Sequence, residues 1–291
     1  ALTDEFNAEL KKRTPRSSFY NCLKNSAHQF YYIPKTDEMY LLAGYPWFKV
    51  RARDQFVSLP GCTLSVGRPD DFTKIMDSAI PHIQDFLNDK PRKNIIKQID
   101  DPDVLLWVTW ALQQYWKENK PVFKEKYVDF LFSIINFILS NKHPNLTVDP
   151  ENGLVSTYGR DVAVSWMNAV QNGKPVTPRS GYLVEFNALW HNALKFAEEV
   201  AAATNKEVLA TTYEEKALKA QQSFIETFLN DAGYLYDYVD GTYADRNVRP
   251  NMIFAVSVDY SPLDRRQKKS VVDFVTKELL TPVGMRSLSP K

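Results

Sequence analysis

Apolar positions recur at helical spacing along much of the chain. Stripes of apolar side chains three or four residues apart run through residues 75–87, 127–138, 186–200, 218–229 and 271–279. This spacing places the apolar side chains on one face of a helix, which can then pack against a core. We therefore expect an amphipathic helix in each of these segments.

Shorter patterns of the same kind raise the expected number of helices to about ten. They lie around residues 16–32, 52–65, 103–117, 160–170 and 249–258. Strand signals are few, and the better ones are residues 38–44 and 233–239. With no long Gly, Ser or Pro linker and no fixed-period repeat, the sequence predicts one all-α domain over residues 1–291 rather than a solenoid. Helical toroids and globin-like packs both fit this pattern.

Charge and hydropathy exclude several function classes. The 291 residues carry 36 basic and 35 acidic side chains, a net charge of +1, so we expect no nucleic-acid partner. The longest apolar run, residues 130–139, is half of the roughly 20 residues that a membrane-spanning helix needs, so it predicts a buried helix and no membrane partner. Two cysteines, Cys22 and Cys62, and the polar residues 1–16 indicate neither a disulfide framework nor a signal peptide, which favours the cytoplasm.

Cofactor motifs are missing from the sequence. The ten glycines include no phosphate-binding loop, and the four histidines show no paired metal-ligand spacing, so we expect neither a cofactor nor a metal ion. Aromatic side chains make up 13% of the chain, and many stand beside Asp, Asn, Gln or Arg. This pairing suits carbohydrate, whose apolar faces stack on rings while its hydroxyls take polar partners. Any single ring is still more often a core residue.

The first polar and aromatic cluster is in residues 43–61. Trp47 and Phe48 offer a stacking surface shortly before Arg53 and Asp54. An Arg-Asp pair beside an exposed Trp can bind two adjacent sugar hydroxyls. Asp54 would be equally well placed as a cap or dipole partner at a helix start.

A second cluster occupies residues 165–196, where a loop punctuated by Gly and Pro leads into a long apolar-faced helix. Its candidate functional side chains are Trp166, Asn168, Arg179, Glu185 and Trp190. A charge on Glu185, where the apolar stripe begins, lies either at a surface edge or in a cavity. We interpret the cluster as part of a site.

A third polar segment, residues 233–257, contains Asp237 and Asp240. Asp240 precedes Gly241, a pair typical of a turn. Asp237 is therefore the better candidate for a functional carboxylate.

These segments resemble, in this order, the C-terminal amylo-alpha-1,6-glucosidase domain of glycogen debranching enzymes, in particular the bacterial form. The matching motifs are "AGYPWF" with "RDxFxSLPG", "LLWVTWALQQY", "SWMNA" with "TPRxGYLVEFNALWxNAL", "GYLYDYVDG", "RPNxIFAVS" and "LLTPVGMRSLSP". Together they span roughly residues 40–290. A single such motif would be weak, but the ordered set is specific.

The resemblance implies an (α/α)6 toroid, in which twelve helices form two concentric rings and inter-helix loops build the active site at one mouth. In the family, more chain follows the "LSP" segment and carries the carboxylate that resembles the catalytic base. Here the sequence ends at Lys291. We therefore expect the domain to be a fragment of a longer protein, with the toroid incomplete at its C-terminal end.

The reaction implied is hydrolysis of α-1,6-linked branch points of glycogen or limit dextrin with inversion. It needs an acid to protonate the leaving oxygen and, about 6.5 to 9.5 Å away, a base to activate water. The family's acid resembles the Asp of a Trp-Met-Asp motif, and in this chain Asn168 occupies that position. Three interpretations remain open: an inactivating substitution, a native residue with Glu185 or Asp161 as the proton donor, or a protein that only binds glucan.

From the clusters and the resemblance together we assign a set of site residues. Asn168, at the presumed acid position, and Glu185 are the catalytic candidates. The expected sugar contacts are Trp47, Arg53, Asp54, Trp166, Arg179, Trp190 and Asp237. The expected partner is glycogen or another branched α-glucan. A catalytically silent glucan-binding module, or a glucoamylase-like or trehalase-like glycosidase on the same toroid, is the alternative.

Overall fold

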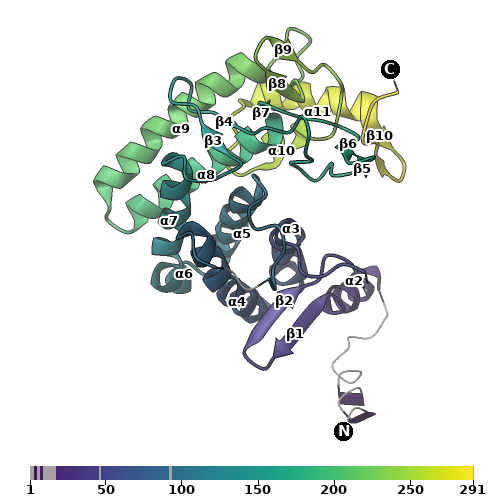
Figure 1. The fold of residues 1–291 in the computed structure, drawn as a ribbon, viewed down its shortest axis with the longest axis vertical. Coiled ribbons are helices and arrows are strands. Elements are labelled where there is room, and N and C mark those ends of the chain that lie inside the picture. Colours follow the sequence, from purple (N-terminus) through teal and green to yellow (C-terminus); the bar gives the residue numbers. More distant parts are fainter. Residues whose placement is uncertain (1–2, 5–6, 9–17, 46, 92–93, 291) are drawn as a thin grey trace. The chain divides into compact units, whose positions relative to one another are not determined.

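The computed structural model describes residues 3–4, 7–8, 18–45, 47–91 and 94–290. The chain divides into two compact units, Ala1–Ile99 and Asp100–Lys291. The expectation of one domain over residues 1–291 stays a prediction. Within the described residues, both units are built mainly of helices with a few short strands (Figure 1).

The first unit packs helices around an antiparallel strand pair. Strand β1 (Tyr31–Lys35) pairs with β2 (Glu38–Leu41), and Tyr31 lies opposite Leu41. The described helices are α2 (Phe19–His28), α3 (Ala52–Cys62), a short 3-10 turn (Leu64–Val66) and α4 (Pro69–Leu87). Helix α4 begins with Pro69, whose missing N–H costs nothing there, and its buried face packs on β2.

The second unit is organised around helix α8 (Val184–Ala203), most of whose residues are buried. This helix packs against several others in the same unit, most extensively against α9. The other described helices of the unit are α5 (Val104–Glu118), α6 (Lys120–Lys126), α7 (Val128–Leu139), α9 (Glu207–Phe228), α10 (Met252–Ser257) and α11 (Arg265–Leu279).

The second unit also contains short antiparallel strands. Three two-stranded pairs are β3 (Thr147–Val148) with β4 (Val155–Ser156), β5 (Val170–Gln171) with β6 (Lys174–Pro175), and β10 (Leu280–Thr281) with β11 (Gly284–Met285). A three-stranded sheet has the order β7 (Tyr182–Leu183), β8 (Tyr238–Asp240), β9 (Tyr243–Ala244). Strand β7 runs directly into α8, so this sheet ties the start of the central helix to the segment around Asp237.

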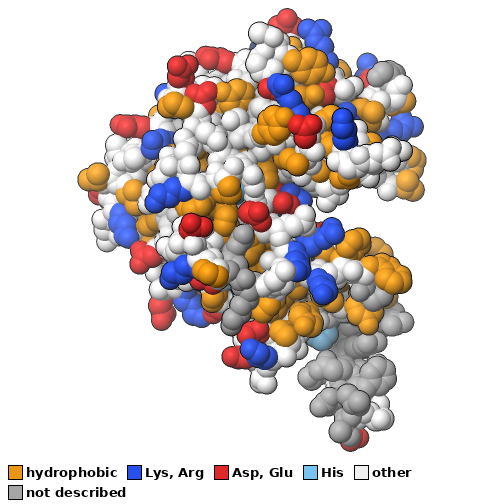
Figure 2. Space-filling model, viewed as in Figure 1, with side chains coloured by type: hydrophobic (Ala, Val, Ile, Leu, Met, Phe, Trp, Pro, Cys, Tyr) orange, Lys and Arg blue, Asp and Glu red, His pale blue; other side chains and the backbone are white. Residues whose placement is uncertain are grey.

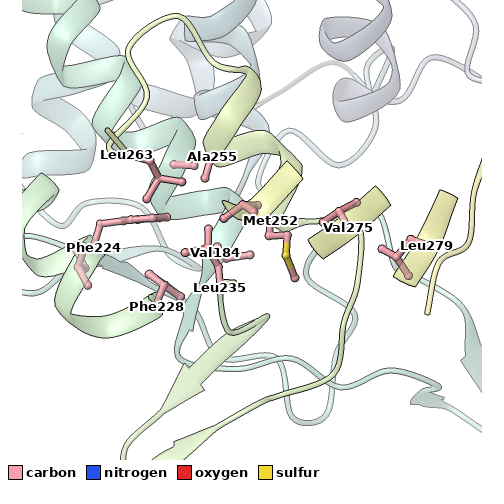
Figure 3. Close-up of a cluster of buried hydrophobic side chains, with 12 residues drawn as sticks. Val184, Phe224, Phe228, Leu235, Met252, Ala255, Leu263, Val275 and Leu279 are labelled. Atoms are coloured by element: carbon pink, nitrogen blue, oxygen red, sulfur yellow. The ribbon is translucent and has the colours of Figure 1, made fainter. Parts of the chain in front are cut away.

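One apolar cluster of the second unit joins α8, α9, α10 and α11 (Figure 3). Its buried members are Leu154, Val184, Ala188, Phe224, Phe228, Leu235, Met252, Ala255, Leu263, Val271, Val275 and Leu279. Burial of such side chains contributes about 1.5 to 3 kcal/mol each. The cluster fixes the first turn of α8, from which Glu185 projects.

The helical stripes predicted their elements well. Helices α4, α7, α8, α9 and α11 contain the five stripes except for the end residues Tyr127 and Leu229, and α3, α5 and α10 match three of the shorter patterns. Helix α2 lies inside the segment 16–32, of which residues 16 and 17 are outside the described residues. The mostly helical fold class is confirmed, and no described helix has the length and apolarity to cross a membrane.

The helix predicted at residues 160–170 is wrong, because this segment is an irregular loop. Just before this loop, Thr157 is joined to Gly181 by paired backbone hydrogen bonds, Thr157 N to Gly181 O at 3.0 Å and Gly181 N to Thr157 O at 2.8 Å. The strand expected at 233–239 is also shorter than predicted, since only Tyr238 and Val239 of that segment join β8.

Charged side chains of both signs are interspersed over the face shown in Figure 2, and neither sign forms a continuous field there. This distribution agrees with the balanced composition of 36 basic and 35 acidic residues. An even mixture gives a weak long-range field, which suits an uncharged ligand.

Candidate active site

Arg179 binds two buried carboxylates in the second unit. Its Nη1 and Nη2 donate to Glu185 Oε1 at 2.5 Å and Oε2 at 2.7 Å. Its Nε donates to Asp237 Oδ2 at 2.7 Å, and Nη2 also donates to Asp237 Oδ1 at 3.1 Å. All three side chains are at most 2% exposed. Bidentate geometry of this kind is among the strongest polar contacts in proteins.

The β7–β8 register places these three side chains together. Leu183 pairs with Tyr238, and the N–H of Val184 donates to the carbonyl of Asp237 at 3.1 Å. Glu185 follows as the second residue of α8, where the helix dipole favours its negative charge. Strand pairing and helix start therefore set the geometry of the network.

Burial and charge act against each other in this network. Burial raises the pKa of the Glu185 carboxyl above its usual value, while the charge and hydrogen bonds of Arg179 oppose that rise. Burial alone would lower the pKa of Arg179, but Glu185 and Asp237 together hold the pKa of its guanidinium above the usual value. Both Glu185 oxygens accept N–H groups, which is the bonding pattern of the ionised form.

Asn251 connects the buried network to an exposed ring. Its Nδ2 donates to Asp237 Oδ1 at 2.8 Å, and its Oδ1 accepts a hydrogen bond of 2.8 Å from Trp166 Nε1. Asn251 is fully buried, whereas the Trp166 side chain is 42% exposed. The polar edge of the indole is therefore anchored inward, and part of the ring is open to solvent.

Asn168 lies two residues beyond this anchored ring, in the loop before β5. Its side chain is exposed and makes no hydrogen bond with the residues that the structure describes. Asp161, in the same loop, is also exposed and accepts a hydrogen bond of 2.6 Å from the Tyr158 hydroxyl. Of the carboxylates considered as alternative proton donors, Asp161 is accessible and Glu185 is not.

Arg249 is a further cation at this network that the sequence reasoning did not select. Its Nε lies 3.4 Å from Asp237 Oδ2, and the side chain is 11% exposed. That Nε is buried and makes no hydrogen bond with the described residues. Arg249 and Asn251 are the first and last residues of the "RPN" motif, which was the signal that could have found them.

Trp190, predicted as a sugar contact, is a core residue. It is 0% exposed, and its Nε1 donates to the carbonyl of Gly153 at 3.1 Å. The Trp190 ring belongs to the apolar stripe of α8 and therefore points toward the core, as most rings in amphipathic helices do. The structure therefore offers no face of Trp190 to a ligand.

The remaining predicted contacts lie in the first unit. Trp47 is 84% exposed, and Asp54 is exposed in the first turn of α3. Arg53 beside it is buried. Whether these three meet the residues of the second unit stays a prediction.

Metal and thiol chemistry have no candidate site in the part of the chain that the structure describes. No group of three or more His, Cys, Asp or Glu side chains there is arranged to hold a metal ion. Cys22 and Cys62 are both free thiols. The chemistry available at the network is that of carboxylates, amides, guanidinium groups and an indole ring.

Known proteins resemble the chain in fold and in sequence profile. The structure is similar to that of a metal-independent alpha-mannosidase from Streptococcus pneumoniae in a non-productive complex with alpha-1,6-mannobiose, with a TM-score of 0.56 and 14% identity. The match covers 99% of this chain and 80% of the mannosidase chain, and at this identity it shows the fold alone. No curated protein matches the sequence significantly. The profile of the amylo-alpha-1,6-glucosidase family matches residues 22–291, so the chain belongs to this family of glycoside hydrolases.

Proposed function

We propose that this chain forms the glucosidase toroid of a debranching enzyme and hydrolyses α-1,6 branch points of glycogen or limit dextrin with inversion. The observation that carries the proposal is the anchoring of Trp166, whose ring is exposed while its N–H is bound by Asn251. That anchor holds the loop in which Asn168 occupies the family's acid position. Family membership over residues 22–291 supports the reaction class.

The toroid itself is part of the proposal. An (α/α)6 arrangement agrees with the helices of both units and with the likeness in fold to a glycosidase. It accounts for the position of the network at the start of α8, because inter-helix loops build the site in such folds.

Each side chain has a proposed role. Trp166 stacks on a pyranose ring, and its anchored N–H fixes the ring plane. Asn168 reaches the glycosidic oxygen or a neighbouring hydroxyl from its exposed loop. Arg249, whose Nε lies 3.4 Å from Asp237 Oδ2, binds sugar hydroxyls through the rest of its guanidinium group. Trp47, Arg53 and Asp54 provide further sugar contacts.

Arg179, Glu185 and Asp237 are proposed to position the site rather than to react. Both oxygens of Glu185 are bound by one guanidinium, and its side chain is 2% exposed. A general acid must lie within hydrogen-bond reach of the leaving oxygen, which this burial disfavours for Glu185. Among the carboxylates first considered, this leaves Asp161 to donate the proton in a chain with a native Asn168.

A glucan-binding module without catalysis is the second candidate. The observation that favours it is the exposed carboxamide of Asn168, which can donate a hydrogen bond but cannot release a proton at neutral pH. Sugar binding through Trp166 and Arg249 would survive in such a protein. Glucose release would not.

The test is Asn168→Asp in the full chain, with glucose release from a branched limit dextrin as the readout. Reintroducing a carboxylic acid should raise the rate at least about tenfold if this position is the acid, since general acids contribute about 10²- to 10⁴-fold. Asn172→Asp, an exposed Asn in the β5–β6 turn, is the matched control and should have no effect. Binding of limit dextrin without glucose release by either chain would favour the second candidate.

The linkage assignment needs a separate panel. Isomaltose, maltose and trehalose present α-1,6, α-1,4 and α,α-1,1 bonds in substrates of equal size. Preference for the α-1,6 bond, with β-glucose as the first product seen by NMR, is expected for inversion. Preference for maltose or trehalose would indicate a glucoamylase-like or trehalase-like enzyme instead.

A further inference from the structure

A pocket lies beside the strand segment that follows Asp237. It encloses about 350 Å³ in the second unit and is lined by Arg160, Pro178, Ser180, Tyr238, Asp240 and Tyr243. We propose that this pocket binds one glucosyl residue of the glycan, beside the loop that carries Asp161. The proposal rests on the proposed function for its choice of glycan.

The pocket and the buried network are built from neighbouring residues of the same segments. Tyr238 and Asp240 line the pocket, whereas Asp237, directly before this strand, binds Arg179. Pro178 and Ser180, which line the pocket, flank Arg179. The network therefore forms a rigid support for the pocket.

An ion pair in the pocket leaves one donor and one acceptor open. Arg160 Nε and Nη2 both donate to Asp240 Oδ2, at 3.0 and 2.7 Å. Arg160 Nη1 and Asp240 Oδ1 make no hydrogen bond with the described residues. An open N–H beside an open carboxylate oxygen matches two vicinal hydroxyls, one accepting and one donating.

Two tyrosine rings supply an apolar surface next to this ion pair. The ring centroids of Tyr238 and Tyr243 are 5.8 Å apart, and Tyr243 is 55% exposed. A pyranose needs such a surface for the C–H face that its hydroxyls leave bare. Burial, helped by the nearby Asp245 carboxylate, raises the pKa of Tyr238 to about 12, so its phenol stays neutral.

Charge balance distinguishes the ligand class. Arg160 and Asp240 are the only charged residues of the lining, and their charges cancel. A phosphate or an ammonium group would gain no attraction from a net opposite charge there, whereas a neutral polyol needs no such attraction. The volume falls at the lower end of the usual range for ligand pockets, about 300 to 1,000 Å³. One sugar unit is therefore the expected occupant.

The experiment measures binding of maltotriose, an unbranched α-1,4 glucan, by isothermal titration and NMR. Trp166→Ala serves as the background chain, because it removes the stacking ring of the candidate active site and leaves the pocket intact. In this background, Arg160→Met and Tyr243→Ala should each weaken maltotriose binding about tenfold, the effect of losing a charge-assisted hydrogen bond or the ring contact. Lys269→Met, which breaks an exposed ion pair with Asp273 on α11, should leave binding unchanged.

The outcomes separate the pocket from the proposed reaction. Equal affinities in the Trp166→Ala background with and without Arg160→Met and Tyr243→Ala would overturn the pocket proposal, even in a chain that releases glucose. Pocket-dependent maltotriose binding in a chain that releases no glucose, with Asn168→Asp included, would keep the pocket and defeat the hydrolase proposal. Tighter binding of inorganic phosphate than of maltotriose would also overturn the pocket's ligand class.

Discussion

Trp166 and Asn251, 85 residues apart in the sequence, are joined by a hydrogen bond of 2.8 Å from indole Nε1 to amide Oδ1. The partner amide is fully buried and bound to Asp237. The bond thus runs from an exposed ring to the interior of the second unit. A side chain held in this way loses little conformational freedom when a ligand stacks on it.

The first prediction is that Trp166 and Asn251 are energetically coupled. Trp166→Phe removes the N–H donor and keeps a ring, and Asn251→Leu removes the acceptor at similar size. In a double-mutant cycle on oligosaccharide binding, we expect a coupling energy of about 1 kcal/mol. The indole N–H resonance assigned to Trp166 should also exchange faster with solvent in Asn251→Leu. Strict additivity together with an unchanged resonance would count against the anchor.

The second prediction concerns Arg179. Arg179→Met leaves the buried carboxylates of Glu185 and Asp237 without their main counter-charge and should destabilise the protein by about 3 to 5 kcal/mol. Arg160→Met breaks an ion pair whose arginine side chain is 64% exposed and should cost less than about 1 kcal/mol. Urea unfolding followed by circular dichroism compares the two. Similar costs for both variants would mean that burial does not set the strength of the network.

The third prediction is a loss of stability between neutral and acidic pH. Burial lowers the pKa of His191 to about 4, and its Nδ1 must donate to the Tyr260 carbonyl at 2.9 Å, since a carbonyl only accepts. Its folded pKa lies below the unfolded value of about 6.5, so the unfolded state binds the extra proton between these values. Stability should therefore fall as pH falls from about 6.5 to 4, by up to on the order of 3 kcal/mol for this one residue.

The measurement is the urea midpoint of the wild-type chain and of His191→Gln at pH 7 and pH 5. The wild type should lose more stability on acidification than the variant. His143, whose pKa burial also lowers to about 4, acts in the same direction and remains in both chains. An equal pH slope in the two chains would show that His191 is not responsible.

The fourth prediction separates the two tryptophans that the sequence grouped together. Trp190→Phe removes a buried hydrogen bond to Gly153 and should cost about 1 to 3 kcal/mol of stability, with glycan affinity unchanged. Trp166→Phe should also lose stability, because it leaves the buried Asn251 Oδ1 without its donor, but unlike Trp190→Phe it should in addition weaken glycan binding. Parallel unfolding and binding measurements decide the matter, and weaker glycan binding in a folded Trp190→Phe chain would restore Trp190 as a contact.

The fifth prediction concerns Gly181, which has a positive φ of 82° and whose added Cβ would lie 2.3 Å from Val239 O. Gly181→Ala should therefore disturb the β7–β8 pairing. The backbone conformation alone is expected to lower the free energy of unfolding by about 1 to 2 kcal/mol, and the loss should exceed this value. Gly173 is the matched control, because its φ is 77° and its added Cβ meets nothing within 4 Å. Gly173→Ala should lose no more stability than its backbone conformation explains. Equal losses of stability for the two variants in thermal unfolding would speak against the close approach at Gly181.

Local patterning predicted much of the fold. The stripe of residues 186–200 identified α8, because a 3.6-residue period is a property of the segment itself. The loop at 160–170 was mistaken for a helix, because it is held by contacts with distant residues, such as that of Trp166 with Asn251, which no local pattern encodes. Helix α6 and most short strands were missed for another reason. Brief elements carry too few positions to show a period.

The candidate site was only partly predictable. Glu185 was selected as a catalytic candidate, and Arg179 and Asp237 as sugar contacts, but their contact with one another depends on a register between segments 58 residues apart. Asn251 carries no charge and sits in a short motif, so nothing in its neighbourhood indicated that it holds Trp166. Trp190 was misread because a ring near a polar cluster looks the same in sequence whether it faces the core or a cavity.

The pairing of Leu183 with Tyr238 must form in the correct register for the chain to bind sugar. Because register decides which side chains meet, a slip of one residue would move Asp237 away from Arg179 and present a neighbouring tyrosine instead. Such a slipped chain would keep its helices and its helical circular dichroism. Contacts between distant segments also form slowly compared with local helices. Helix content is therefore a poor measure of how many molecules in a preparation can bind sugar, and the Trp166 indole signal is the better assay.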